Sequence, residues 1–72
     1  MNITVEYVKD NNKLKKELNV NEDDFKLKDL KQKLSLNNKY DYITLVNGKN
    51  KQDHYNIKDN DSIQIYYLMD GG

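Results

Sequence analysis

The sequence predicts an α+β fold, in which one helix packs across one side of a mixed β-sheet of four to five strands. Near both ends of the chain, apolar residues alternate with polar ones, which is the period of a half-buried strand. Between these segments, leucines recur at intervals of three and four residues, which is the period of an amphipathic helix. We therefore expect the order strand, strand, helix, strand, strand, with the apolar face of the helix on the apolar face of the sheet.

The composition limits the classes of protein to consider. Seventy-two residues suffice for one domain, residues 1–72, with one modest core and no deep catalytic cleft. Twelve basic and twelve acidic side chains cancel, so the chain lacks the positive field that favours nucleic acid or an anionic membrane. It has no cysteine, and its first residues lack the basic and long apolar regions of a secretion signal. We therefore expect a cytoplasmic protein that binds neither nucleic acid nor membrane.

The first two strands are expected to form a hairpin. The turn-forming residues 10–12 come so soon after the first strand that they favour an antiparallel partner, although the charged residues 15–17 fit a helix as readily. The apolar residues of the first strand are Ile3, Val5 and Tyr7. The apolar residues of the return strand are Leu14, Leu18 and Val20.

The helix is expected next. Residues 21–24 are an asparagine and three acids, which suit the positively polarised start of a helix. Leu27, Leu30 and Leu34 then form its apolar face. The lysines expected to face water are Lys28, Lys31 and Lys33.

The last two strands complete the sheet. The third strand is expected at a β-prone run that ends in the tight-turn dipeptide Asn47-Gly48. The apolar residues of this run are Ile43, Leu45 and Val46. The alternating residues of the final strand are Ile63, Ile65 and Tyr67. The outer strands of this order, connected through the helix, would be neighbours at the centre of the sheet.

Two of the three glycines of the chain are its last two residues, Gly71 and Gly72. Because glycine has no Cβ, such a pair can extend through a narrow channel and lets the reactive groups of a partner approach a terminal carboxylate. We expect a flexible C-terminal tail at about residues 69–72. The plain alternative is a frayed end without a function.

Three segments of the chain resemble the sulfur carrier proteins of thiamin and molybdopterin synthesis. They are an apolar-Asn-Gly turn at residues 45–49, an Asp-x-Asp loop that leads into the last strand at residues 57–65, and the diglycine. The helix segment 27–30, with Leu34 after it, is also similar to the helix of these carriers, so the resemblance covers essentially the whole chain. It implies a ubiquitin-like β-grasp fold.

The chain departs from the pattern of this family at three places. Residues 59–61 read Asp-Asn-Asp where Asp-Gly-Asp is usual, and asparagine also tolerates a left-handed backbone. Tyr67-Leu68 replaces a proline pair that is common in the molybdopterin carrier, and Asp70 stands where a small residue is common. The thiamin, molybdopterin and other branches therefore all stay open.

The resemblance implies that a partner related to ubiquitin-activating enzymes uses ATP and Mg²⁺ to join the Gly72 carboxylate to AMP. A persulfide sulfur then converts this adenylate into a thiocarboxylate, which a synthase consumes as a sulfide donor. Gly72 would be the reacting residue, and Gly71 would give access to it. The chain would be a carrier rather than an enzyme, without a cofactor or metal of its own, because the acids, bases and metal belong to its partners.

Residues beside the tail are candidates for partner binding. If Ile63 and Ile65 face inward, Tyr66 and Leu68 face the other way, and an exposed aromatic beside an exposed aliphatic side chain forms a plausible binding patch. Simple sheet packing is an equal alternative, because a register error of one residue exchanges the two faces. The partner-binding candidates are Tyr66, Leu68, Met69 and Asp70.

Other polar residues give weaker signals. His54 is the only histidine, and without a second nitrogen ligand or a cysteine we assign it to a solvated loop. Asp59 and Asp61 are better explained by a turn before a strand than by acid-base work or a calcium loop, whose further ligands are missing. The helix lysines form a solvated face, although one of them could accept a modifier.

Two other functions compete with sulfur transfer. A ubiquitin-like protein modifier shares every step up to the nucleophile, which is then a lysine amine of a target protein. A non-covalent ubiquitin-like binding domain needs no tail, so deletion of Gly72 would leave its function intact. The short length and the carrier-like spacing favour sulfur transfer.

Overall fold

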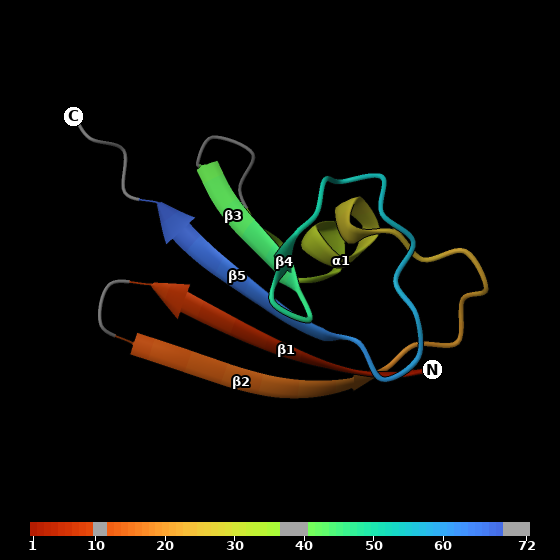
Figure 1. Cartoon of the computed structure of the whole chain (residues 1–72). Helices are drawn as coiled ribbons and strands as arrows, with labels where there is room; N and C mark the ends of the chain where they lie inside the picture. The colour runs from red at the N-terminus through yellow and green to blue at the C-terminus, as the bar shows by residue number, and fades with distance from the viewer. Residues whose placement is uncertain (10–11, 37–40, 69–72) are drawn as a thin grey trace.

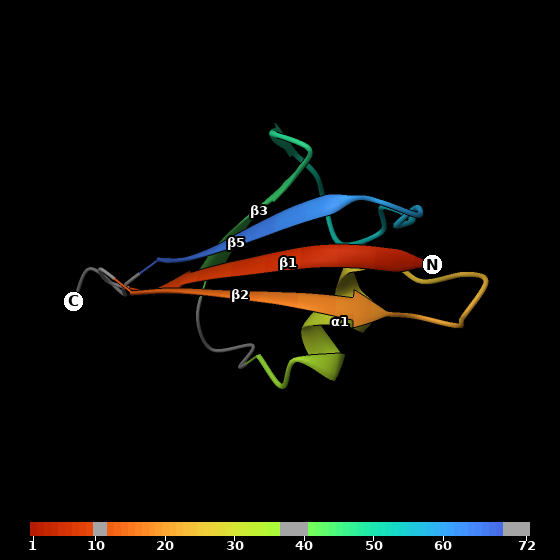
Figure 2. The same cartoon turned by 90° about the horizontal axis from the view of Figure 1, so that it is seen from below.

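The structure is a computed structural model that describes residues 1–9, 12–36 and 41–68. Its elements, in chain order, are β1 (Asn2–Lys9), β2 (Asn12–Asn19), α1 (Leu27–Lys33), β3 (Asp41–Val46), β4 (Lys49–Asn50) and β5 (Ser62–Leu68). The five strands form one sheet in the order β2-β1-β5-β3-β4 (Figure 1). Figure 2 shows the sheet edge-on, with α1 on one of its two sides. The chain therefore has the expected α+β architecture of a mixed sheet and a single helix.

The first and last strands lie side by side, as the sequence predicted. β1 pairs with β2 in the antiparallel sense and with β5 in the parallel sense. On its other side, β5 pairs with β3 in the antiparallel sense, and β4 continues from β3 as a short hairpin strand. A parallel pair requires a long crossover between its strands, and α1 lies within that crossover. As a result β5, the strand that leads toward Gly72, is held on both edges.

The core lies between the sheet and α1. It contains the inward residues of every long strand except β2, together with two leucines of the helix and residues of the loops. Its buried apolar residues are Ile3, Val5, Val20, Phe25, Leu27, Leu30, Val46, Ile57, Ile63 and Ile65. The alternation expected for β1 and β5 is confirmed. In β3, the inward row consists of Tyr42, Thr44 and Val46, so Ile43 and Leu45 point to the other side of the sheet.

The start of the helix differs from the expectation. Residues 21–24 do not cap it, because α1 begins only after Lys26. Phe25 before it is buried, and Lys26 forms a β-bridge with Asn56, so the chain must stay extended until the core has been reached. The acid that serves the first turn is Asp29, whose carboxylate accepts a hydrogen bond from the Lys26 N–H at 2.9 Å.

The loop before β5 caps the same end of α1. The Leu27 N–H donates to the Tyr55 carbonyl and the Lys28 N–H donates to the Asp53 carbonyl, both at 3.1 Å. These two N–H groups have no partner within the helix, so the loop supplies partners that the sequence alone did not identify.

One helix lysine departs from the expected solvated face. Lys28 and Lys33 are exposed, as predicted. Lys31 is half-buried, and its ammonium group donates a hydrogen bond of 2.6 Å to the Asp53 carboxylate. Leu34 lies just past the end of α1 and still packs against the core. The helix face is therefore partly occupied by the loop that contains Asp53.

The β3–β4 turn confirms the interpretation of the Asn-Gly dipeptide. Asn47 and Gly48 both have a positive φ, of 52° and 84°, and the flanking residues Val46 and Lys49 are paired across the hairpin. Two consecutive positive φ values define a type I′ turn, whose twist matches that of the adjoining strands. A Cβ at residue 48 would meet no neighbouring atom within 4 Å, so only the backbone angle selects glycine there.

We predict that Gly48→Ala lowers the free energy of unfolding by about 1 kcal/mol, because alanine pays the left-handed backbone penalty that glycine avoids. Urea denaturation of the variant and the wild type measures the difference. The matched control is Asn50→Ala in the same hairpin, which should change the stability by less than about 0.5 kcal/mol. Equal effects of the two substitutions would contradict the turn assignment.

Candidate functional site

The side of the sheet opposite α1 is open in the described part of the chain (Figure 2). Near the end of β5 it carries apolar side chains from three adjacent strands. Tyr66 of β5 has Val8 of β1 and Ile43 of β3 as its direct Cα partners, so the three residues form a row across the sheet. Leu68 follows Tyr66 on the same face. We call Val8, Ile43, Tyr66 and Leu68 the exit patch.

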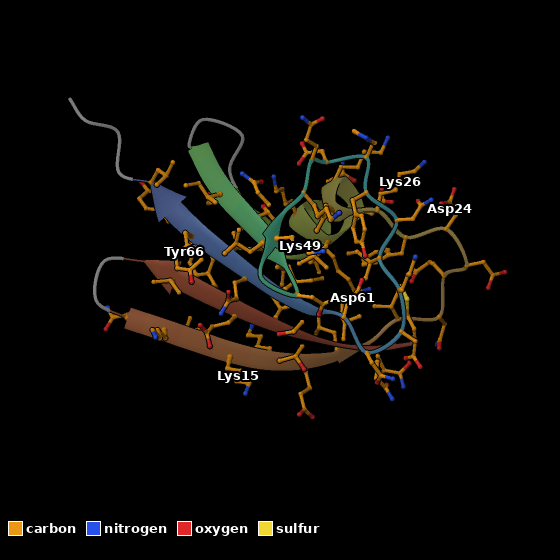
Figure 3. All side chains as sticks on the ribbon, viewed as in Figure 1. Lys15, Asp24, Lys26, Lys49, Asp61 and Tyr66 are labelled. Carbon is orange, nitrogen blue, oxygen red and sulfur yellow. The ribbon has the colours of Figure 1, made fainter. Side chains whose placement is uncertain are left out.

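The exit patch is accessible. Ile43 is 38% exposed and Leu68 is 41% exposed, while Val8 and Tyr66 are half-buried. Figure 3 looks onto the open face, and the labelled Tyr66 lies there near the end of the β5 arrow. Ile63 and Ile65, by contrast, are fully buried on the helix side. The predicted facing of Tyr66 and Leu68 away from the core is therefore confirmed.

Aromatic rings support β5 from the opposite face. Tyr67 contacts Tyr42 edge-on, with 5.8 Å between the ring centroids, and Tyr42 lies 6.5 Å from Tyr7. Such tilted aromatic contacts add roughly 0.5–1.5 kcal/mol beyond the burial of area. The end of β5 is therefore fixed by ring contacts on one face while its other face carries the exit patch.

The remaining predicted site residues lie outside the described residues. They are Met69, Asp70, Gly71 and Gly72. β5 ends at Leu68, so this tail follows directly from the exit patch in sequence. A partner that contacts the exit patch would therefore contact the part of the chain that directly precedes the tail in sequence.

A buried carboxylate lies at the opposite end of β5. Asp61 is only 6% exposed, and three donors satisfy its side chain. The Asn47 amide donates to Oδ1 at 2.9 Å, while the Tyr55 hydroxyl and the Lys58 N–H donate to Oδ2 at 3.0 and 2.9 Å. Figure 3 places Asp61 where the β3–β4 hairpin meets the loop that leads into β5.

The same region sets the register of β5. The Asn47 side-chain oxygen accepts a hydrogen bond from the Ser62 N–H at 3.0 Å, and the Asn47 N–H donates to the Ser62 carbonyl at 2.8 Å. The Asp61 carbonyl accepts from the Thr4 N–H at 3.1 Å. Asp61 and Ser62 are thus tied to β1 on one side and to the hairpin on the other, which determines the face on which Tyr66 lies.

The two loop carboxylates act separately. Asp59 accepts a hydrogen bond from the Asn2 N–H at 2.7 Å, whereas Asp61 serves the network described above. Asn60 between them has a φ of 67°, the left-handed conformation that asparagine tolerates. The interpretation of this segment as a turn before a strand is therefore confirmed.

His54 is exposed in another turn, and no group of three or more His, Asp or Glu side chains in the described ranges is placed to hold a metal ion.

Tyr55 has an altered acidity within this network. Burial raises the pKa of its phenol above the ordinary value, and the hydrogen bond to Asp61 and the negative charge of that carboxylate raise it further. Each of these causes disfavours the phenolate. Tyr55 therefore remains a donor to Asp61 throughout the neutral range.

Within the described residues, no helix has the length and apolar character needed to cross a membrane. Comparison of the chain with protein families, with curated proteins and with solved structures gave no match. The arrangement of the residues themselves must consequently carry the functional argument.

The sequence pointed to only half of the exit patch. Val8 and Ile43 join Tyr66 because of the strand register, which local periodicity does not specify. Asn47 was identified as a turn residue, but its side-chain bonds to Asp61 and Ser62 were not anticipated. The sequence feature that came closest to indicating these hydrogen bonds was an Asn-Gly turn and an Asp-rich loop, which flank two adjacent strands.

We predict that the stability advantage of the wild type over Tyr55→Phe shrinks as the pH rises above about 10, the ordinary tyrosine pKa. The raised pKa of Tyr55 means that its protonated form is favoured by folding, so its contribution is fully present below that value and is lost as the pH passes the folded pKa. Thermal unfolding of both proteins over an alkaline pH series measures this. Both proteins contain the same lysines, so the effect of lysine titration cancels in the difference between their stabilities. A stability difference that stays constant over the pH series would therefore contradict the prediction.

Proposed function

We propose that the chain is a sulfur carrier protein with a ubiquitin-like β-grasp fold, similar to the carriers of thiamin and molybdopterin synthesis. In this proposal Gly72 is the group that reacts, and the chain itself is not an enzyme. The observation that carries the proposal is the position of β5, which lies between β1 and β3 in the sheet (Figure 1) and carries part of the exit patch near its end. In the sequence, only Met69 and Asp70 separate β5 from the diglycine.

The topology supports the fold assignment. The first and last strands are paired in parallel, with the helix in the crossover between them, as the order of the elements predicted, and this arrangement is compatible with a β-grasp fold. The Asn-Gly turn and the Asp-Asn-Asp loop, on which the resemblance was based, contact each other through Asn47 and Asp61. Two of the segments that carry the resemblance thus form one structural unit.

The proposed chemistry activates a carboxylate. An oxygen of the Gly72 carboxylate attacks the α-phosphorus of ATP, pyrophosphate leaves, and an acyl adenylate forms on a partner that also binds Mg²⁺. The terminal sulfur of a partner persulfide then attacks the acyl carbon and displaces AMP, which gives an acyl disulfide. A second partner thiol cleaves the sulfur–sulfur bond, forming a protein disulfide and releasing the Gly72 thiocarboxylate.

The chain's own residues would bind and position rather than catalyse. The exit patch offers contiguous apolar area to an adenylyltransferase related to ubiquitin-activating enzymes, and afterwards to a synthase that accepts sulfur. Gly71, without a Cβ, would let the tail pass through a narrow channel, and Met69 and Asp70 would add contacts. ATP and Mg²⁺ would be held by the partner.

A second candidate function shares the same activation. In a ubiquitin-like modifier, a lysine amine of a target protein attacks the Gly72 adenylate or a thioester derived from it, and an isopeptide bond forms. The helix carries two exposed lysines, Lys28 and Lys33. Their amines are accessible, so a second copy of the modifier could be joined to them to form a chain, and this supports the modifier as the second candidate. The two functions differ only in the nucleophile.

We predict that incubation with an extract of the source cells, ATP and a sulfur donor exchanges one carboxylate oxygen of the chain for sulfur. Intact-mass analysis measures the exchange, and a variant that lacks Gly72 should show none. Adducts that join Gly72 to lysine would instead support the modifier. If the extract activates a known carrier but neither product forms, the proposal is wrong.

We also predict that Leu68→Asp lowers the rate of thiocarboxylate formation by about tenfold or more, because it places a charge in an apolar contact. Its side chain is 41% exposed, so the fold should persist, which circular dichroism verifies. The matched control is Asn21→Asp, which adds the same charge at an exposed residue between β2 and α1. Equal rates for both variants would argue against a role of the exit patch.

A further inference from the structure

The outer edge of β2 is a second surface with the properties of a binding site. In the described part of the chain, β2 pairs only with β1, so its other edge has no strand partner. All but one of its residues are exposed. Unpaired strand edges are templates for the addition of another strand, and proteins usually cover or blunt them.

The hydrogen-bond pattern identifies which residues of β2 face that edge. Met1 and Val20 exchange two backbone bonds, at 2.7 and 2.8 Å. Doubly bonded pairs alternate with unbonded ones along an antiparallel ladder, so Leu14, Lys16 and Leu18 direct their backbone groups toward β1. The residues whose N–H and C=O groups point outward are therefore Lys13, Lys15, Glu17 and Asn19.

A groove runs beside this edge on the helix side of the sheet. Figure 2 shows that α1 lies under the half of the sheet near the N-terminus, so the hairpin of β1 and β2 extends beyond it. The groove encloses about 230 Å³, and Leu14, which is 60% exposed, is part of its wall. The residues that line it are Val5, Tyr7, Leu14, Lys16, Leu34 and Leu36.

The charge along β2 selects the occupant. Lys13, Lys15 and Lys16 outnumber the single acid of the strand, Glu17. Lys15 has Glu6 as its Cα partner on β1, whereas the partners of Lys13 and Lys16 are valines. A second copy that paired through β2 would bring together two strands that each carry three lysines and one acid, so their net positive charges would repel each other. The edge therefore favours a partner strand of the opposite charge.

We propose that the β2 edge binds an extended peptide segment of a partner protein in which acidic and apolar residues alternate. The peptide adds a sixth strand to the sheet and bonds to the outward N–H and C=O groups of Lys13, Lys15 and Glu17. Its residues opposite Lys13 and Lys15 are acidic and lie on the open face. Its residue opposite Leu14 is apolar and enters the groove. This surface borders the exit patch at Lys13, whose Cα partner is Val8, but strand addition along β2 does not depend on tail chemistry.

The test uses a blocked synthetic peptide in which aspartate alternates with valine, added to isotopically labelled protein. NMR should show shift changes along β2 and slowed hydrogen exchange at the amides of Lys13, Lys15 and Glu17, which point to solvent in the free chain. The affinity should fall as the salt concentration rises. A peptide of the same composition, with its aspartates and valines in separate blocks, should not slow the exchange.

Two variants and a control complete the test. Lys13→Glu, whose Cα partner Val8 carries no charge, should weaken the binding by about tenfold, because an attractive cross-strand pair with the peptide becomes repulsive. Leu14→Ser should also weaken the binding, because it removes an apolar side chain from the wall of the groove. The control, Lys49→Glu, makes the same charge change on the exposed β4 at the other edge and should have little effect.

Three results would overturn the proposal. If the alternating peptide changes neither the shifts nor the hydrogen exchange of β2, the edge does not bind it. If the block peptide binds equally well, the attraction depends on charge alone and not on the addition of a strand. Concentration-dependent broadening of the β2 signals in the free protein would show that a second copy occupies the edge. Failure of the exit-patch experiments would leave this proposal intact, since those experiments change Leu68 and Gly72, and neither residue belongs to β2 or to the groove.

Discussion

The arrangement of the strands in this protein depends on the hydrogen bonds that the buried Asp61 carboxylate accepts. A buried charge is costly unless hydrogen bonds compensate it, and here Asn47, Tyr55 and Lys58 all donate to it. These donors come from the β3–β4 turn and from the loop between β4 and β5. One side chain thus holds together segments that pure apolar packing, which has no direction, would leave free to slide.

The functional surfaces follow from the placement of β5. Because β5 lies between β1 and β3, its inward residues complete the core, and its outward residues meet Val8 and Ile43. A shift of one residue in this strand would bury Tyr66 and expose Ile65. The polar network at the start of β5 therefore determines which side chains a partner meets at its end, next to the residues that lead to Gly72.

Much of the fold could be predicted from local patterns. Alternation in β1 and β5, the Asn-Gly turn and the positive φ of Asn60 all follow from the preferences of the residues concerned. The start of α1 could not be predicted in this way. Acidic residues at 21–24 looked like a cap, but burial of Phe25 and the bridge between Lys26 and Asn56 keep the chain extended beyond them. Tertiary contacts overrode a local preference.

The candidate site was predictable only in part, for a related reason. Tyr66 and Leu68 follow from alternation along one strand, whereas the exit patch also needs Val8 and Ile43, which are more than twenty residues away in sequence from Tyr66. Ile43 was expected only as part of a β-prone run, and the register turned it to the open face. Pairing between distant strands is a property of the whole sheet, so it had to be observed.

The pair of Asn47 and Asp61 offers the most direct test of this account. A double-mutant cycle with Asn47→Gly, which keeps the positive φ, and Asp61→Ala measures their coupling by urea denaturation. We expect the double variant to lose about 1–2 kcal/mol less than the sum of the single losses, as a hydrogen bond to a charged group should give. Additivity within about 0.3 kcal/mol would mean that Asp61 does not join the hairpin to β5, and would contradict the account.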